Sequence, residues 1–293
     1  MPALILVSPE ALGGKTTVAV GLAHRIASEG RTLALNRLSD DEHSEADAAL
    51  FAALEVGSSE ATKADVDLIE APAGDPAAFL EQSPDARALV VAAASTPARE
   101  LAEYCRPLGD RLAGVIINKT PRKRLEAVRA EAEAAGLRVI AILPEDRLLA
   151  APVLRDVVLT LSAHAEHLDN GAGLQPLERP VIATISADPG QGYFAGYGAS
   201  AVIVRSDKPD LQLAALNAGA NSLIVTGGLP ILSYVLERAE EDQIPLLRTG
   251  MDTISAVQSI EGTYGSLPFA GGEAKIGRIS ALLADVDIAS LIG

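Results

Sequence analysis

Short apolar runs alternate with helix-spaced apolar positions along the whole chain of 293 residues. The first run, residues 4–7, contains no polar position, which is typical of a strand buried on both faces of a parallel sheet. From Thr16 onward the apolar positions recur with helical spacing, and Gly30 predicts the end of that helix. Repetition of this pattern predicts an α/β fold with mostly parallel sheets and flanking helices. The expected strands are residues 4–7, 32–35, 66–70, 88–92, 112–117 and 139–143, then 181–185, 201–205, 222–225 and 245–247.

A change of composition divides this pattern into two parts. Residues 167–180 combine glycine, proline and asparagine, which is typical of a linker between domains. The chain is long enough to give each part a sizeable core. We therefore expect a first domain over residues 1–168, a linker over residues 169–180 and a smaller second domain over residues 181–293.

The turn after the first strand has the sequence Ser8-Pro-Glu-Ala-Leu-Gly-Gly-Lys-Thr-Thr17. In P-loop proteins such a strand–loop–helix turn binds phosphate through backbone N–H groups, while a lysine reaches the terminal phosphates and a hydroxyl ligates magnesium. We assign the last two roles to Lys15 and Thr16. The usual pattern has a glycine where this chain has Pro9, so a turn with a chance Gly-Lys-Thr is the alternative. The predicted nucleotide-binding residues of this turn are Glu10, Gly13, Gly14, Lys15, Thr16 and Thr17.

A P-loop also needs an acidic group at the end of a neighbouring strand, to hold magnesium or order a water. Glu70 ends the expected strand 66–70, and Asp67 in the same strand is an alternative. Asp47 follows the second strand and is a further candidate, although the acidic run 40–47 also fits a solvated loop. The predicted magnesium ligands are Thr16, Glu70 and Asp47.

Asn118 and Lys119 directly follow the expected strand 112–117. An asparagine amide offers both a donor and an acceptor, so it can recognise the edge of a purine base. We therefore add Asn118 and Lys119 to the predicted nucleotide site.

The first half resembles the dethiobiotin-synthetase-like P-loop domain found at the N-terminus of long bacterial phosphotransacetylases. The resemblance spans residues 1–168 and implies binding of ATP, or another nucleotide, with Mg²⁺. In that superfamily the loop glycine stands where this chain has Ser8, and the lysine after the second strand corresponds to Arg37. Only residues 39–64 replace the longer substrate-binding region of the ATP-dependent synthetases, which puts synthetase chemistry in doubt. The segments that carry the resemblance are residues 8–16, 68–70, 116–119 and 143–152.

The second half, over residues 177–293, resembles the DRTGG domain, which follows the P-loop domain in those enzymes. Its name motif corresponds to residues 206–210 and 226–228, with Lys208 where arginine is usual. The resemblance implies regulation and assembly rather than acetyl transfer, and no acetyltransferase domain is expected because the chain stops at Gly293. No nucleophile or acid–base constellation is visible, so no catalytic residue is predicted. The expected effector-binding residues are Ser206, Asp207, Lys208, Asp210, Thr226, Gly227 and Gly228.

Residues 187–198 combine glycines with Tyr193, Phe194 and Tyr197, in a chain with only 3% aromatic residues. Exposed rings suit an interface or a ligand wall, and the alternative is that they cap the core of this domain. Together with the resemblance, this cluster leads us to expect a homodimer in which the second domain takes part.

The net charge of −15 argues against nucleic acid or an anionic membrane as the main partner. No apolar stretch is long enough to span a membrane, and the single cysteine, Cys105, suits a reducing cytoplasm. We interpret the chain as a cytoplasmic nucleotide-binding regulatory or sensor protein, with slow ATP hydrolysis as an open question and a small effector or another protein as a further partner. The alternatives are an ATP-dependent synthetase of the dethiobiotin or cobyrinate-amidating kind and a scaffold whose P-loop has decayed.

Overall fold

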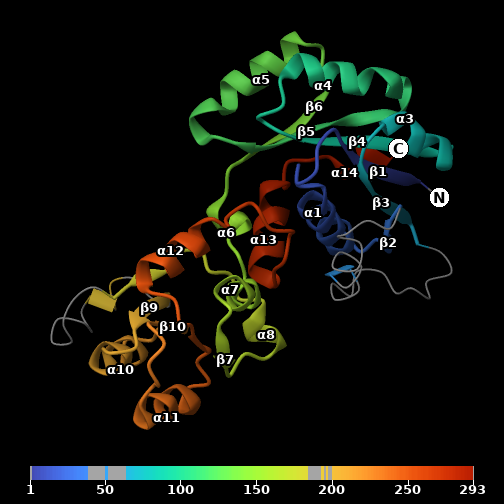
Figure 1. Ribbon diagram of the computed structural model, residues 1–293. Helices are drawn as coiled ribbons and strands as arrows, with labels where there is room; N and C mark the ends of the chain where they lie inside the picture. Colours follow the sequence, from blue (N-terminus) through green and yellow to red (C-terminus); the bar gives the residue numbers. More distant parts are fainter. Residues whose placement is uncertain are drawn as a thin grey trace. The chain divides into compact units, whose positions relative to one another are not determined.

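The computed structural model describes residues 2–38, 50–51, 64–183, 193–194, 196 and 200–292 (Figure 1). The chain divides into two compact units, and each is described by itself below. Unit 1 consists of Met1–Leu149 and Glu273–Gly293, and unit 2 consists of Ala150–Gly272. None of the helices that the structure describes has the length and apolar content needed to cross a bilayer.

Unit 1 is built on a six-stranded parallel sheet with strand order β2-β3-β1-β4-β5-β6. Its central strand β1 is buried from Leu4 to Ser8 because helices cover both faces of the sheet. Alternate residues of β1 therefore enter two different cores, with Leu4 and Leu6 on one face and Ile5 and Val7 on the other. The strands are β1 (Ala3–Ser8), β2 (Leu33–Arg37), β3 (Val66–Ala73), β4 (Ala86–Ala93), β5 (Leu112–Thr120) and β6 (Val139–Pro144).

Two groups of helices cover this sheet (Figure 1). One face carries α1 (Lys15–Ser28) together with α13 (Glu273–Leu282) and α14 (Ile288–Ile292). The other face carries α3 (Pro76–Gln82), α4 (Ala98–Cys105) and α5 (Leu125–Ala134), with the short 3₁₀ helices η1 (Arg106–Arg111) and η2 (Arg122–Arg124) nearby in the chain. The short helix α6 (Arg147–Ala150) follows β6.

Unit 2 contains a five-stranded sheet with strand order β7-β11-β10-β9-β8. Three of its pairings are parallel, and only the edge strand β7 runs antiparallel to β11. The strands are β7 (His164–Glu166), β8 (Val181–Ile182), β9 (Ala201–Arg205), β10 (Ser222–Thr226) and β11 (Leu246–Arg248). The helices are α7 (Leu154–Leu161), α8 (Asn170–Gly173), α10 (Pro209–Asn217), α11 (Ser233–Glu241) and α12 (Thr253–Glu261). The predicted α/β class with two sheets is confirmed.

Both boundaries between the units differ from the predicted ones. Residues 150–168 join unit 2, because Leu154 and Val157 of α7 pack with Ile203 of β9 and because β7 pairs with β11. Residues 273–293 join unit 1, because α13 packs on α1 so closely that a Cβ at Gly21 would lie 2.7 Å from Ile279. Unit 2 is therefore inserted into unit 1.

Polar contacts fix the C-terminal segment on unit 1 as well. The Arg25 guanidinium donates to the carbonyl oxygens of Leu283 and Val286, the latter at 2.8 Å. The Arg278 guanidinium forms an ion pair with Asp146 at 2.7 Å, which ties α13 to the segment that follows β6.

Two rings of the glycine–aromatic segment belong to the core of unit 2. Phe194 is buried in the same apolar cluster as Val204 and Leu223, and Tyr193 packs against it edge-on with ring centroids 5.4 Å apart. These two rings therefore serve core packing, and Tyr197 lies outside the described residues.

Candidate functional site

The turn between β1 and α1 requires glycine at two positions, at Gly14 because of its backbone shape and at Gly13 because of the space beside it. Gly14 has φ of 95°, and a Cβ there would lie 2.1 Å from the side-chain nitrogen of Asn118. A Cβ at Gly13 would lie 2.6 Å from the Ser8 hydroxyl. Lys15 begins α1, so the N-terminus of this helix follows directly on the two glycines. A helix N-terminus reached through a left-handed glycine is a suitable site for phosphate.

Ser8 occupies the position where the related loops have glycine. Its side chain is buried, and its hydroxyl accepts the backbone N–H of Glu10 at 3.3 Å. Because Gly13 has no side chain, the hydroxyl of Ser8 fits beside it. Gly13 thus provides the space that a glycine at position 8 would otherwise leave.

Two cations, one hydroxyl and one carboxylate lie near the start of α1. They belong to Lys15, Arg37, Thr16 and Glu70. The Thr16 hydroxyl donates to Glu70 Oε1 at 2.9 Å, and Arg37 Nη1 lies 3.8 Å from the same oxygen. Glu70 is 3% exposed and Lys15 is 7% exposed. The sheet register brings Glu70 close to Arg37 and to β1, because Glu70 on β3 pairs with Leu6 on β1 and with Arg37 on β2.

The structure separates Glu70 from the alternative acid, Asp67. Asp67 lies at the other end of β3, opposite Ala3, where it accepts from the Asn36 amide at 2.9 Å. Three strand residues correspond to about 10 Å, so Asp67 is remote from Thr16. Asp47 lies outside the described residues.

Asn118 connects the β1–α1 turn to the end of β5. Its amide nitrogen donates to the Gly13 carbonyl at 3.2 Å, and its amide oxygen accepts the N–H of Lys119 at 2.8 Å. Lys119 itself has a left-handed backbone, with φ of 53°. The Asn118 amide thus contacts backbone groups on both sides and holds the turn in place, a structural role that its position after a strand does not reveal.

Glu10 links the same turn to the start of α4. Its Oε1 accepts the backbone N–H of Ala93 at 2.8 Å and the Thr96 hydroxyl at 3.1 Å. Sequence reasoning missed Ala93 and Thr96, because neither belongs to a motif and both lie more than 80 positions from Glu10.

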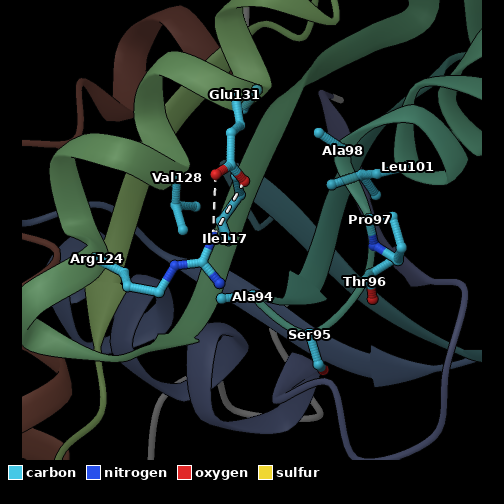
Figure 2. A pocket seen from close by; sticks show the side chains of 11 residues that line it. Ala94, Ser95, Thr96, Pro97, Ala98, Leu101, Ile117, Arg124, Val128 and Glu131 are labelled. Atoms are coloured by element: carbon cyan, nitrogen blue, oxygen red, sulfur yellow. Dashed lines mark hydrogen bonds and ion pairs between the residues drawn. The ribbon is translucent and has the colours of Figure 1, made fainter.

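A cavity of about 230 Å³ lies beyond Thr96, between the start of α4 and α5. Figure 2 shows Ser95 and Thr96 on one side of it and the Arg124–Glu131 ion pair, 3.0 Å long, on the other. The rest of its lining is mostly apolar, including Leu101 and Val128. The volume is below the roughly 300–1,000 Å³ of typical small-molecule sites, so the cavity alone does not define a ligand.

The predicted effector residues lie in the turns at the carboxyl ends of β9 and β10. Gly227 and Gly228 both have left-handed backbones, with φ of 95° and 76°. Their N–H groups donate to the carbonyl oxygens of Met251 and Thr249, at 2.8 and 3.1 Å, and the N–H of Leu229 donates to the Ser206 hydroxyl at 3.3 Å. The three turns after β9, β10 and β11 are therefore bonded to one another.

The remaining predicted effector residues contact neighbouring side chains or lie at the start of α10. Asp207 forms an ion pair with Arg205 at 2.6 Å. Lys208 is the N-cap of α10, Asp210 lies in its first turn, and the Thr226 hydroxyl contacts the Thr253 hydroxyl at 2.7 Å.

Comparison with known families identifies this part of the chain. Residues 156–263 match the DRTGG domain family. They form a DRTGG domain. The domain lies within unit 2, and it begins and ends earlier than the predicted range 177–293.

Solved structures with a remote likeness to the chain include proteins of three kinds. One is the structure of the CBS and DRTGG domains of the regulatory region of Clostridium perfringens pyrophosphatase, complexed with the activator diadenosine tetraphosphate. It is 16% identical to this chain, the match covers 62% of this chain and 76% of that chain, and the TM-score is 0.36. The hydrogenase maturation factor HypB from Archaeoglobus fulgidus is 16% identical, with 48% and 81% covered and a TM-score of 0.35. Chloroplast FtsY from Physcomitrella patens is 17% identical, with 48% and 58% covered and a TM-score of 0.37. At TM-scores below 0.5 these likenesses carry no weight for fold or function.

Replacing Gly227 of the DRTGG domain by alanine should lower the free energy of unfolding by about 1–2 kcal/mol, because a left-handed backbone is unfavourable for residues with a Cβ. The added Cβ would also lie 3.1 Å from the Ser206 hydroxyl. Denaturant titration measures the effect. Gly250→Ala is the matched control in the neighbouring turn, where a Cβ meets nothing within 4 Å. Equal losses in the two variants would contradict the structural role of Gly227.

Proposed function

We propose that this chain is a nucleotide-binding regulatory protein, in which unit 1 binds ATP with Mg²⁺ and the DRTGG domain serves regulation. The observation that carries the proposal is the β1–α1 turn. There a left-handed Gly14 precedes the buried Lys15, and the hydroxyl of Thr16 is hydrogen-bonded to the buried Glu70. A phosphate chain on this turn would receive backbone N–H groups, the helix N-terminus and the Lys15 ammonium.

The donor set also fits Mg²⁺. This ion prefers oxygen ligands, and in nucleotide sites it binds one or two protein groups, several waters and the phosphates. The Thr16 hydroxyl and the Glu70 carboxylate are 2.9 Å apart and would supply the protein ligands. Across the described ranges, no cluster of three or more histidine, cysteine or acidic side chains is arranged for a metal, and a site completed by phosphates and water does not require one. When bound, Mg²⁺ would neutralise phosphate charge.

The remaining residues of the site hold its shape. Asn118 and Glu10 tie the turn to β5 and to the start of α4. Arg37 adds a second cation beside Glu70, at the position where the related synthetases have lysine. The turn is therefore supported from β5 through Asn118, from the end of β4 through Glu10 and from β3 through the Thr16–Glu70 hydrogen bond, which favours binding without large rearrangement.

Replacing Lys15 by alanine should weaken Mg²⁺–ATP binding by roughly 10- to 100-fold, since a charge-assisted contact to phosphate is lost. Isothermal titration calorimetry measures the dissociation constant. Lys123→Ala is the matched control, because it removes the same charge from an exposed lysine of η2.

Because Lys15 is buried, its replacement needs a check of folding. Thermal unfolding without nucleotide provides this check, and Lys15→Met keeps most of the side-chain volume if the alanine variant is unstable. If wild type, Lys15→Met and Lys123→Ala bind ATP equally well, the proposed phosphate site is excluded.

A further inference from the structure

The cavity between α4 and α5 changes in character from its buried part to its exposed part. The buried part, which we call the floor, consists of Leu101, Ile117, Val128 and Ala132, and these residues are at most 6% exposed. The exposed part, which we call the rim, contains the Arg124–Glu131 pair, with side chains 53% and 56% exposed, and Ser95 on the other side (Figure 2). A cavity of this kind suits a molecule that is apolar at one end and polar at the other.

The rim offers one charge of each sign. Both carboxylate oxygens of Glu131 accept from the same nitrogen of Arg124, Nη2, at 3.0 and 3.3 Å. A guanidinium has further N–H donors and a carboxylate has further lone pairs, so each partner keeps the capacity to bind a ligand. Among the described residues, no other charged side chain lines the cavity. The rim therefore matches a molecule that carries a carboxylate and an ammonium group close together.

A molecule with a single charge fits the rim less well. A carboxylate that approaches Arg124 also comes near Glu131, and the two negative charges repel each other. An amine that approaches Glu131 is repelled by Arg124 in the same way. When the ligand carries both charges, each side chain of the rim gains a partner of opposite sign, and the new hydrogen bonds are charge-assisted.

The volume of the cavity sets the size of this molecule. An apolar protein cavity of about 150 Å³ holds benzene. By the same ratio, a cavity of about 230 Å³ holds roughly nine non-hydrogen atoms, which is the size of leucine or isoleucine and well below that of a nucleotide. We infer that the cavity binds a free α-amino acid with a branched apolar side chain. Its carboxylate contacts Arg124, its ammonium group contacts Glu131, and its side chain lies on the floor.

Thr96 connects this cavity to the β1–α1 turn. It lines the cavity, and its hydroxyl donates to Glu10 Oε1 at 3.1 Å. An amino acid that packs against residues 94–98 restrains Thr96 and, through it, Glu10. A turn that is already restrained loses less conformational freedom when ATP binds, so bound leucine should raise the affinity for ATP. This link rests on the proposed function, whereas the amino-acid site itself does not.

Isothermal titration calorimetry of the full chain without nucleotide tests the amino-acid site. The wild type should bind L-leucine. Isocaproate, which lacks the ammonium group, and isoamylamine, which lacks the carboxylate, should bind at least about tenfold more weakly, because each loses a charge-assisted hydrogen bond. Arg124→Gln should weaken the binding of leucine by the same factor. Arg129→Gln is the matched control, because it removes the same charge from an exposed arginine of α5 that does not line the cavity.

A further variant fills the cavity. Ala98 lines it from the first turn of α4, so Ala98→Phe should abolish leucine binding. Circular dichroism checks its folding, and Arg124→Gln alone decides if this variant does not fold. A wild type that does not bind leucine at millimolar concentration would overturn the inference. So would isocaproate binding as tight as that of leucine, equal leucine affinities of Arg124→Gln and Arg129→Gln, or a folded Ala98→Phe variant that binds like the wild type.

The link to the proposed nucleotide site is tested by titrating Mg²⁺–ATP in the presence and absence of L-leucine. Leucine should raise the affinity for ATP at least about fivefold, and ATP should raise the affinity for leucine by the same factor. Equal ATP affinities with and without leucine would exclude the link. If ATP does not bind at all, the proposed function fails, while the leucine titrations still decide the amino-acid site.

Discussion

Deletion of residues 273–293 should leave unit 1 unable to fold. The segment contributes six buried apolar side chains to the core beneath α1, and each is worth roughly 1.5–3 kcal/mol. Their sum, about 9–18 kcal/mol as an upper estimate, is comparable to the whole stability of about 5–15 kcal/mol that a typical domain has. The six side chains are Ile279, Leu283, Val286, Ile288, Leu291 and Ile292.

Thermal unfolding followed by circular dichroism measures this effect on unit 1. The informative control replaces residues 150–272 by a short flexible linker, which keeps residues 273–293 and removes unit 2. The ion pair between Asp146 and Arg278 joins the two segments that the linker connects. This control should fold and bind ATP, whereas residues 1–168 alone should not. A cooperative transition of residues 1–168 at the wild-type temperature would contradict the role of the C-terminal segment.

Replacing Glu70 by glutamine should remove most of the Mg²⁺-dependent gain in ATP affinity, by roughly tenfold or more, because a neutral amide is a poor ligand for this ion. The variant should also be less stable by about 3 kcal/mol, since Glu70 compensates the Arg37 cation in a largely buried pair. Calorimetric titration of ATP with and without Mg²⁺ measures the first effect, and denaturant titration measures the second.

Asp67→Asn is the matched control for Glu70→Gln. It makes the same chemical change on the same strand, but at the end of β3 that pairs with Ala3. We expect it to keep the full Mg²⁺ dependence. If Glu70→Gln keeps that dependence as well, the metal-binding acid is another residue, and Asp47 is the remaining candidate.

The strands of unit 1 could be predicted because their apolar runs are continuous. Residues 4–7, 88–92 and 112–117 lie within β1, β4 and β5. The position of Glu70 near Thr16 also follows from the sequence, since the carboxyl ends of parallel strands meet at one edge of a sheet. Local patterns were sufficient in both cases, because the residues of a strand themselves indicate whether it is buried and in which direction it runs.

The packing of the C-terminal segment could not be predicted in this way. Ile279 and Leu283 form an apolar stripe on α13, but a stripe does not specify which surface covers it. The same holds for Asn118, whose contact with Gly13 depends on the exact approach of two segments 105 positions apart. In the β1–α1 turn, the Ser8 hydroxyl fits because Gly13 leaves space for it, and a sequence motif does not contain this information.

The insertion of unit 2 into unit 1 reverses the order in which the two units can be completed during synthesis. Unit 2 is synthesised completely before residues 273–293 are made, so it can fold before unit 1 is complete. The β1–α1 turn near the start of the chain, which is the proposed phosphate site, must wait, because the part of α1 that packs on α13 has no cover until α13 is made. The proposed site therefore stays incomplete through almost the entire synthesis of the protein, and chaperones that shield apolar surface have their longest opportunity there.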